Sequence, residues 1–261
     1  MAEALTAALI AKWAMLGLAA FLAGIVDAVI GGGGMVQLPA LFAVFPGTVP
    51  ATLFGTNKLA SAIGTTGAAL RYSSALKVDW RIARPAIVAA FIASLLGAYA
   101  VTFVPAEPLR KALPFILLVL LVYTLRSAMG LEHLPRHSEG KAQTIAAAGS
   151  SVIGFYDGFF GAGTGAFYKL LFVRGLGFDF LHAAAPAKFT NVASNLAAVL
   201  VFALSGQLFW GLGLWMAAAN FAGGQIGSMT ALKLGSGFIR TAFITVVTAL
   251  IAKTFYDAYL A

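Results

Sequence analysis

The sequence predicts an all-α polytopic membrane protein made of two homologous halves, and three observations support this fold class. Hydrophobic residues make up 61% of the 261 residues and charged residues only 10%, whereas a soluble domain is about 25% charged. Apolar runs of transmembrane length recur along the whole chain, and their pattern repeats after half its length. A soluble fold of this size could not bury so much apolar surface. A soluble globular enzyme and a disordered chain are therefore excluded.

The charge and cysteine counts narrow the class further. The formal net charge is +8, but the basic residues lie mostly between long apolar runs, as they do in cytoplasmic loops of membrane proteins. They form no basic face with interleaved aromatics, so nucleic-acid binding is not expected. The chain contains no Cys, which excludes a disulfide scaffold and thiol redox chemistry.

Apolar runs long enough to span a bilayer, which needs about 20 residues, define the predicted helices in chain order. They cover residues 13–30, 52–70, 82–104, 113–129, 144–160, 181–204, 209–232 and 239–259. Two runs of half that length, residues 35–45 and 166–173, are expected to be re-entrant or interfacial helices. The most polar stretch, residues 132–141, is expected to be the central loop.

An internal repeat relates the two halves at an offset of 130 residues, without a gap. The matched pairs include residue types that rarely coincide by chance. They are Gly24 and Gly154, Asp27 and Asp157, Gly31 and Gly161, Gly33 and Gly163, Lys58 and Lys188, Trp80 and Trp210, Gly97 and Gly227, and Arg110 and Arg240. The repeats are residues 1–130 and 131–261, which form one membrane domain.

The charge difference between equivalent loops predicts that the repeats are inverted. The first half carries Arg71, Lys77, Arg81 and Arg84 where the counterpart, residues 201–214, has no charge. The positive-inside rule places the first loop in the cytoplasm and leaves the second for the outside. Inverted repeats of this kind build many transporters. A parallel arrangement of four plus four spans is the alternative.

A glycine-rich break interrupts each half just before its short helix. The first reads GIVDAVIGGGG and the second GFYDGFFGAGTG, from Gly24 and Gly154 respectively. Runs of glycine end a helix and let the backbone approach a ligand. The first amides of the helix that follows lack intrahelical partners and favour an anion. The predicted amide donors are those of Gly33, Gly34, Gly163, Thr164 and Gly165. The alternative is that these glycines only permit close helix packing.

Ionisable residues inside the apolar runs are matched across the repeat. Such residues are expensive in a membrane and usually functional. Lys58 and Lys188 each begin a polar stripe at i, i+3, i+7, which places the stripe on one helix face. The predicted substrate-binding side chains are Asn57, Lys58, Ser61, Thr65, Lys188, Asn191 and Asn195. Asp27 and Asp157 are expected to serve in coupling or in ion pairs.

Two alternatives concern the lysines. Each of the matched lysines could pair with an aspartate instead of a ligand, for example Lys188 with Asp27 across the pseudo-twofold, and the pair could open when an anion competes. Lys169 and Arg174 have no basic counterpart in the first half. We expect them to snorkel at the membrane interface.

The motifs resemble one known family over essentially the whole chain. GIVDAVIGGGGMVQLPAL and GTNKLAS in the first half, with GFYDGFFGAGTGAF and AKFTNVASNLAA in the second, are similar to the sulfite exporter TauE/SafE family of membrane permeases. This resemblance implies movement of sulfur-containing anions such as sulfite and organosulfonates, with export as the direction. The residue chemistry alone indicates a carrier of small anions.

Together these observations predict a multi-pass transporter in the cell (inner) membrane. It would export sulfite or an organosulfonate by alternating access; an anion channel and a proton-coupled importer of an unrelated anion are the alternatives. We expect no enzymatic activity, cofactor or metal site. The expected partners are the small anionic substrate and the lipid bilayer, with a homodimer as an open alternative and no nucleic acid.

Overall fold

A computed structural model gives the fold. It describes residues 2–105, 137–179 and 181–234, and single residues at 107, 108, 111, 115, 118, 119, 248 and 256; for residues 2–6 and 8 it describes the backbone alone. All regular elements in this part of the chain are helical. They are α1 Ala2–Val29, α2 Gly34–Val44, α3 Pro50–Ala75, α4 Trp80–Val101, α6 Glu139–Phe159, α7 Thr164–Leu170, the π-helical turn η1 Leu171–Gly175, α8 Ala184–Leu204 and α9 Trp210–Leu234.

The long helices coincide with the apolar runs of the sequence, and local chemistry sets their ends. Proline at position 50 begins α3, where its missing N–H costs nothing. The Asp79 side chain caps α4 by accepting a hydrogen bond from the Arg81 amide, 3.1 Å away. Helices α1 and α6 both end at a glycine break. The runs predicted at residues 113–129 and 239–259 lie outside the described residues.

The outer surface of the bundle has the character of a protein that lipid surrounds. Three described helical segments are long and apolar enough to cross a membrane: Leu9–Val29, Trp80–Val101 and Ala184–Leu204. Large apolar side chains point outward from several helices, among them Val152 and Leu204, which are 74% and 81% exposed. In water this surface would be unfavourable, so it supports the predicted membrane protein.

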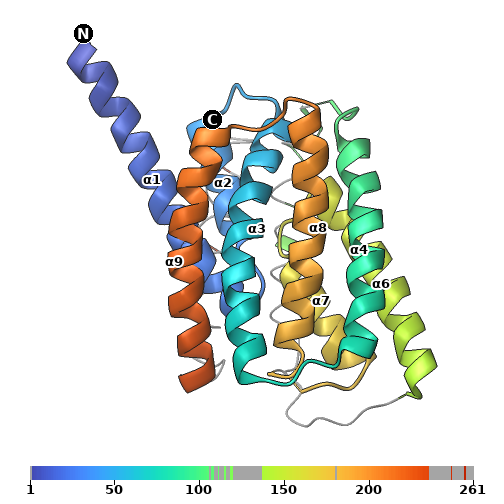
Figure 1. Ribbon diagram of the computed structural model, residues 1–261. Coiled ribbons are helices and arrows are strands. Elements are labelled where there is room, and N and C mark those ends of the chain that lie inside the picture. The colour runs from blue at the N-terminus through green and yellow to red at the C-terminus, as the bar shows by residue number, and fades with distance from the viewer. Residues whose placement is uncertain are drawn as a thin grey trace.

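The helices of one half pack on the helices of the other. Helix α1 lies against α9 and α6 against α4, while α3 lies between α9 and α8, and α8 lies between α3 and α4 (Figure 1). By the 130-residue offset, the α1–α9 contact corresponds to α6–α4, and α3–α9 to α8–α4. Each of these contacts joins the two halves.

Glycines make these contacts close, and the contacts themselves follow the repeat. A Cβ added to Gly97 would lie 2.0 Å from the Phe155 carbonyl oxygen, and one added to Gly227 would lie 2.5 Å from the Ile25 oxygen. At the 130-residue offset, Gly227 is the counterpart of Gly97, and Phe155 is the counterpart of Ile25. Small residues at helix interfaces let backbones approach in this way in membrane proteins.

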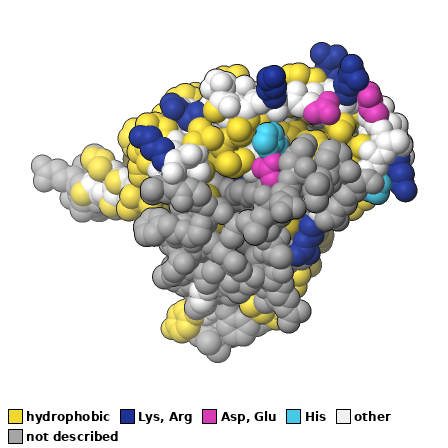
Figure 2. Space-filling model, turned by 90° about the horizontal axis from the view of Figure 1, so that it is seen from below, with side chains coloured by type: hydrophobic (Ala, Val, Ile, Leu, Met, Phe, Trp, Pro, Cys, Tyr) yellow, Lys and Arg dark blue, Asp and Glu magenta, His cyan; other side chains and the backbone are white. Residues whose placement is uncertain are grey.

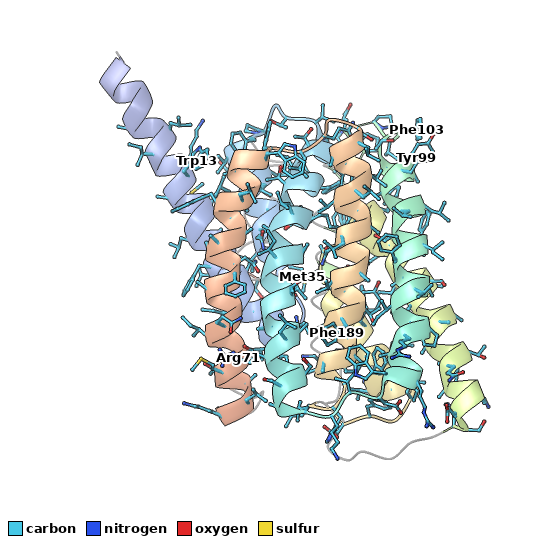
Figure 3. All side chains as sticks on the ribbon, viewed as in Figure 1. Trp13, Met35, Arg71, Tyr99, Phe103 and Phe189 are labelled. Atoms are coloured by element: carbon cyan, nitrogen blue, oxygen red, sulfur yellow. The ribbon has the colours of Figure 1, made fainter. Side chains whose placement is uncertain are left out.

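Repeat-related helices run in opposite directions in the bundle. Helix α3 descends from the upper end in Figure 1 and α8 ascends; α4 ascends and α9 descends. Lys and Arg side chains gather around the rim of the lower end (Figure 2). Arg71 lies at this end, whereas Tyr99 and Phe103 lie at the upper end (Figure 3).

Candidate functional site: two ion pairs between the halves

Lys58 lies inside the bundle, about two turns into α3, and forms an ion pair with the other half. Its Nζ is 2.5 Å from Oδ1 of Asp157, which is near the end of α6, and both side chains are 1% exposed. The backbone at Gly161 makes room for the ammonium group, since a Cβ there would lie 2.3 Å from Nζ. The lysine therefore sits directly against the second glycine break.

Lys188 makes the corresponding contact from the second half. Its Nζ is 2.6 Å from Oδ2 of Asp27, at the end of α1, and it also donates to the Asp27 carbonyl oxygen. The Thr65 hydroxyl donates to the same Oδ2 at 3.0 Å. Lys188 and Thr65 thus donate hydrogen bonds to the same oxygen of the Asp27 carboxylate.

The two ion pairs are reciprocal. Lys58 and Asp157 are the repeat counterparts of Lys188 and Asp27, and each lysine pairs with the aspartate of the opposite half. The pairs therefore lie where the halves meet. Removing two opposite charges from water is favourable only when the geometry is good, which these short contacts supply.

Lys169 was expected to snorkel at the membrane interface, and this expectation is wrong. The residue lies on α7 with 2% exposure, and its Nζ donates to the carbonyl oxygen of Val29, two residues after Asp27. It is close enough to Lys188 and Asp27 to interact electrostatically with both. A clue was present in the sequence: Lys169 follows the second glycine break by only a few residues, on the short apolar run. Arg174, beyond α7, is exposed.

The two glycine breaks touch each other at the centre. Gly31 and Gly161, which correspond in the repeat, have φ angles of +95° and +81°, values that only glycine adopts without strain. The Ala166 amide donates to the Gly31 oxygen at 2.9 Å. A Cβ on Gly34 would lie 3.0 Å from the Gly161 oxygen. The breaks thus bring both aspartates and both short helices together.

The predicted amide donors are placed at the starts of these short helices. Gly33 precedes α2, and its carbonyl oxygen accepts hydrogen bonds from the Val36 and Gln37 amides, while Gly34 begins the helix. Gly163, with φ +75°, precedes α7, which Thr164 and Gly165 begin. All five residues therefore lie beside the meeting point of the breaks.

The predicted polar stripes lie largely buried on α3 and α8. On α3, Asn57 and Thr65 are buried and Ser61 is half-buried. On α8, Asn191 and Asn195 are buried, and the Asn195 amide donates to the Asn191 side-chain oxygen at 3.2 Å. Asn191 also borders α7, because a Cβ on Gly165 would lie 3.1 Å from its Nδ2.

Several buried polar atoms of the two halves lack a hydrogen-bond partner among the described residues. They are Oδ2 of Asp157, Oδ1 of Asn57, Oγ1 of Thr164, and both side-chain polar atoms of Gln37. Most buried polar groups in proteins have a partner, so each exception calls for an explanation. These atoms, among them Oδ2 of Asp157 in the Lys58 pair, retain hydrogen-bonding capacity that the described residues do not use.

Apolar contacts close the bundle on both sides of the ion pairs. Toward the upper end, Phe54 packs edge-on against Phe160 and Phe42, with ring centroids 5.5 and 5.9 Å apart. Toward the lower end, the Tyr72 hydroxyl donates to the Ala28 oxygen at 2.9 Å. Aromatic side chains thus lie on both sides of the buried ion pairs.

A capped loop positions the helix that carries Lys188. Asp179 accepts hydrogen bonds from the Leu181 and His182 amides, 2.9 and 3.0 Å away, just before α8. Partial burial acts to raise the pKa of the Asp179 carboxyl, but the hydrogen bonds from His182 and Leu181 outweigh it, so the pKa lies below its usual value. The carboxylate stays charged and holds the loop at neutral pH.

Comparisons with known proteins agree with these features. The family model for the sulfite exporter TauE/SafE matches residues 16–254. The chain is 37% identical to the probable membrane transporter protein ORF9 of Sinorhizobium sp over 94% of its length and 92% of the relative's. It is 36% identical to the probable membrane transporter protein YfcA of Escherichia coli K12, over 92% and 88%. No solved structure matches. The chain therefore belongs to the sulfite exporter TauE/SafE family of membrane transporters.

Proposed function

We propose that this transporter carries a small anion, a sulfur oxyanion or a sulfonate, through the site between its halves. The single observation that carries the proposal is the reciprocal pairing of Lys58 with Asp157 and Lys188 with Asp27. The pairs place charged groups where the two halves meet, which is where transporters built from inverted repeats bind their substrates. The family's printed description supplies the sulfur chemistry.

The proposed ligand site consists of cations surrounded by hydrogen-bond donors. Lys58, Lys188 and Lys169 supply positive charge, and a bound anion would compete with the aspartates for it. Hydroxyl and amide side chains add donors for several oxygens at once. These are Asn57, Ser61, Thr65, Thr164, Asn191 and Asn195. Tetrahedral oxyanions present several equivalent oxygens to such a set.

The proposed mechanism is alternating access between inverted repeats, residues 1–130 and 131–261, in the cell membrane. The opposite directions of α3 and α8 support inversion (Figure 1), and the basic lower rim would face the cytoplasm. Eight spans and two re-entrant short helices would complete the fold. One half would rock against the other, so that the contacts around Phe54 open while those around Tyr72 stay closed, and then the reverse.

Export is the direction that the membrane potential favours for an anion that crosses alone. Moving one negative charge out of a negative interior gains about 2.3 kcal/mol per 100 mV. An anion that crosses alone therefore needs no coupling ion in order to be exported. The aromatic contacts of Phe54 with Phe42 and Phe160 disfavour the alternative, a continuously open channel.

Counterflow in proteoliposomes tests the proposed function. Vesicles loaded with unlabelled methanesulfonate should accumulate labelled methanesulfonate transiently, and sulfite or sulfate added outside should reveal which oxyanions compete. Transient accumulation is expected of a carrier and cannot occur through a channel. Uptake that only equilibrates, without saturation, would support the channel and contradict alternating access. The absence of any flux for all these anions would contradict the substrate class.

A further inference from the structure

We infer that Asp157 is the proton-binding carboxylate of this transporter and takes up a proton when the anion draws Lys58 away. The inference rests on the anion transport proposed above and adds a second ligand, the proton, to the same site. It assigns different roles to two ion pairs that the repeat makes formally equivalent.

The two carboxylates differ in how fully they are satisfied. Oδ2 of Asp27 accepts hydrogen bonds from Lys188 and from the Thr65 hydroxyl, at 2.6 and 3.0 Å. Asp157 binds Lys58 through Oδ1, and its buried Oδ2 has no hydrogen-bond partner among the described residues. If the lysine left, Asp27 would keep one donor, whereas Asp157 would have none of those seen here.

One repeat-related substitution explains this difference. The counterpart of Thr65 in the second half is Asn195. Thr65 donates to the aspartate, but Asn195 donates its amide hydrogen to the side-chain oxygen of Asn191 instead, at 3.2 Å. The donor that stabilises the Asp27 carboxylate is therefore turned away from Asp157.

The groups around Asp157 supply one cation and one buried hydroxyl, that of Tyr168, which has no hydrogen-bond partner among the described residues. The titratable groups that interact with it in the described chain are Lys58 from α3, Tyr168 from α7 and Tyr156 from its own helix. The Tyr156 hydroxyl already donates to the Ala162 oxygen at 2.8 Å. From α4, the nearby Ser94 hydroxyl donates to the Ser194 oxygen of α8 at 2.6 Å. Lys58 is thus the one cation among these groups.

Charge balance predicts that Asp157 takes up a proton when the anion binds Lys58. In the resting pair, the Lys58 ammonium and the Asp157 carboxylate sum to zero. A bound monoanion accepts the Lys58 hydrogen bond, and the carboxylate loses its counterion in a site that water does not reach. A proton from solution bonds to Asp157 and leaves a neutral acid beside a lysine–anion pair, so the sum is again zero. A buried carboxylate without a counterion would be far costlier than its protonated form.

Linkage gives this step a measurable signature. If one proton binds with each anion, the dissociation constant of the anion falls about tenfold for each unit by which the pH falls, between the higher pH at which the anion-loaded site titrates and the lower pH at which the anion-free site titrates. An anion and a proton that cross together move no net charge, so the membrane potential that favours export of a lone anion does not drive the coupled step, and net flux follows the sum of the anion and proton gradients. Methanesulfonate is the suitable probe, since it remains a monoanion throughout the pH range.

The experiment measures methanesulfonate affinity for the purified full chain by calorimetry between about pH 5.5 and 8. The wild type should show the tenfold change per pH unit, and Asp157→Asn should show an affinity independent of pH. Asp27→Asn, the repeat-matched comparison, should keep the slope. Asn195→Thr should give Asp157 the missing donor and shift the pH dependence to lower pH. A slope that persists in Asp157→Asn, or that disappears equally in Asp27→Asn, would overturn the inference.

A second measurement needs no anion. Lys58→Met removes the counterion permanently, so Asp157 should be protonated at neutral pH. Infrared difference spectra should then show the carbonyl stretch of a protonated carboxylic acid, which the wild type and Lys58→Met/Asp157→Asn should lack. Absence of the band in a monodisperse Lys58→Met preparation would refute the proton site. Methanesulfonate binding without pH dependence would refute the proton site but leave the proposed anion transport standing. If the band is present but methanesulfonate does not bind, the proton site stands and the proposed anion is contradicted.

Discussion

Lys58 of α3 and Asp157 of α6 are 99 positions apart in the chain and form a buried ion pair of 2.5 Å at the second glycine break. The pair joins the two halves at the point where the polypeptide reverses. It is matched by Lys188 and Asp27 at the first break. Stability and transport should therefore depend on the same few side chains.

The first prediction concerns stability. Asp157→Leu should destabilise the protein by about 3–5 kcal/mol, because it leaves the Lys58 ammonium buried without its partner. The double variant Lys58→Met/Asp157→Leu should recover most of this loss, since it leaves no buried charge. Unfolding of the purified protein in a denaturant series measures both values. Additive losses in the double variant would show that the pair contributes no coupling.

The second prediction uses two glycines with positive φ. Gly161→Ala should abolish most transport, because its Cβ would lie 2.3 Å from the Lys58 ammonium and displace it. Gly206→Ala is the matched control: its φ is +67°, but a Cβ there would meet nothing within 4 Å. Both variants should lose about 1–2 kcal/mol of stability from backbone strain. Equal flux in the two variants would show that the space beside Lys58 is not needed.

The third prediction concerns motion between the breaks. A Cβ on Gly34 would lie 3.4 Å from the Ala162 Cα, so cysteines at these two positions are close enough for a disulfide. Oxidation of Gly34→Cys/Ala162→Cys should stop counterflow and reduction should restore it, because the bond fixes one half to the other. Since the chain has no Cys, the single-cysteine variants are clean controls. Full counterflow in the crosslinked protein would argue against separation of the breaks during transport.

The fourth prediction tests the inverted topology. Ala75 and Ser205 are exposed, occupy equivalent positions in the two repeats and lie at opposite ends of the bundle. A membrane-impermeant maleimide should label Ser205→Cys in intact spheroplasts, and Ala75→Cys only after lysis. Labelling of both from the same side would instead support the parallel arrangement.

Much of the helical framework follows from hydrophobic runs and local signals. The run at residues 52–70 predicts α3, and the structure extends it to Pro50–Ala75 because proline can begin a helix and polar residues continue its last turn. The short runs after the glycine breaks are indeed short helices, α2 and α7. The π-helical turn η1 has no sequence signal that we recognised.

The sequence was less informative about which charges meet. The repeat offered the pairing of Lys188 with Asp27 as an alternative to a ligand contact, and the structure shows this pair; spacing along a helix alone could not decide between the two. For Lys169 the sequence did not reveal that the side chain is buried in the bundle. Its short helix looks interfacial by length, and only the packing of α7 against α8 and α6 shows that the lysine is buried.

The most direct test of the central claim is methanesulfonate counterflow with Lys58→Ala and Lys188→Ala, measured beside Lys77→Ala, which removes an exposed lysine at the lower rim. Reconstitution of equal amounts of monodisperse protein controls for folding. We predict that the two buried variants lose at least about tenfold in flux, the equivalent of about 1.4 kcal/mol, while Lys77→Ala keeps the wild-type rate. Unchanged flux in both Lys58→Ala and Lys188→Ala would contradict the assignment of the paired lysines to anion transport.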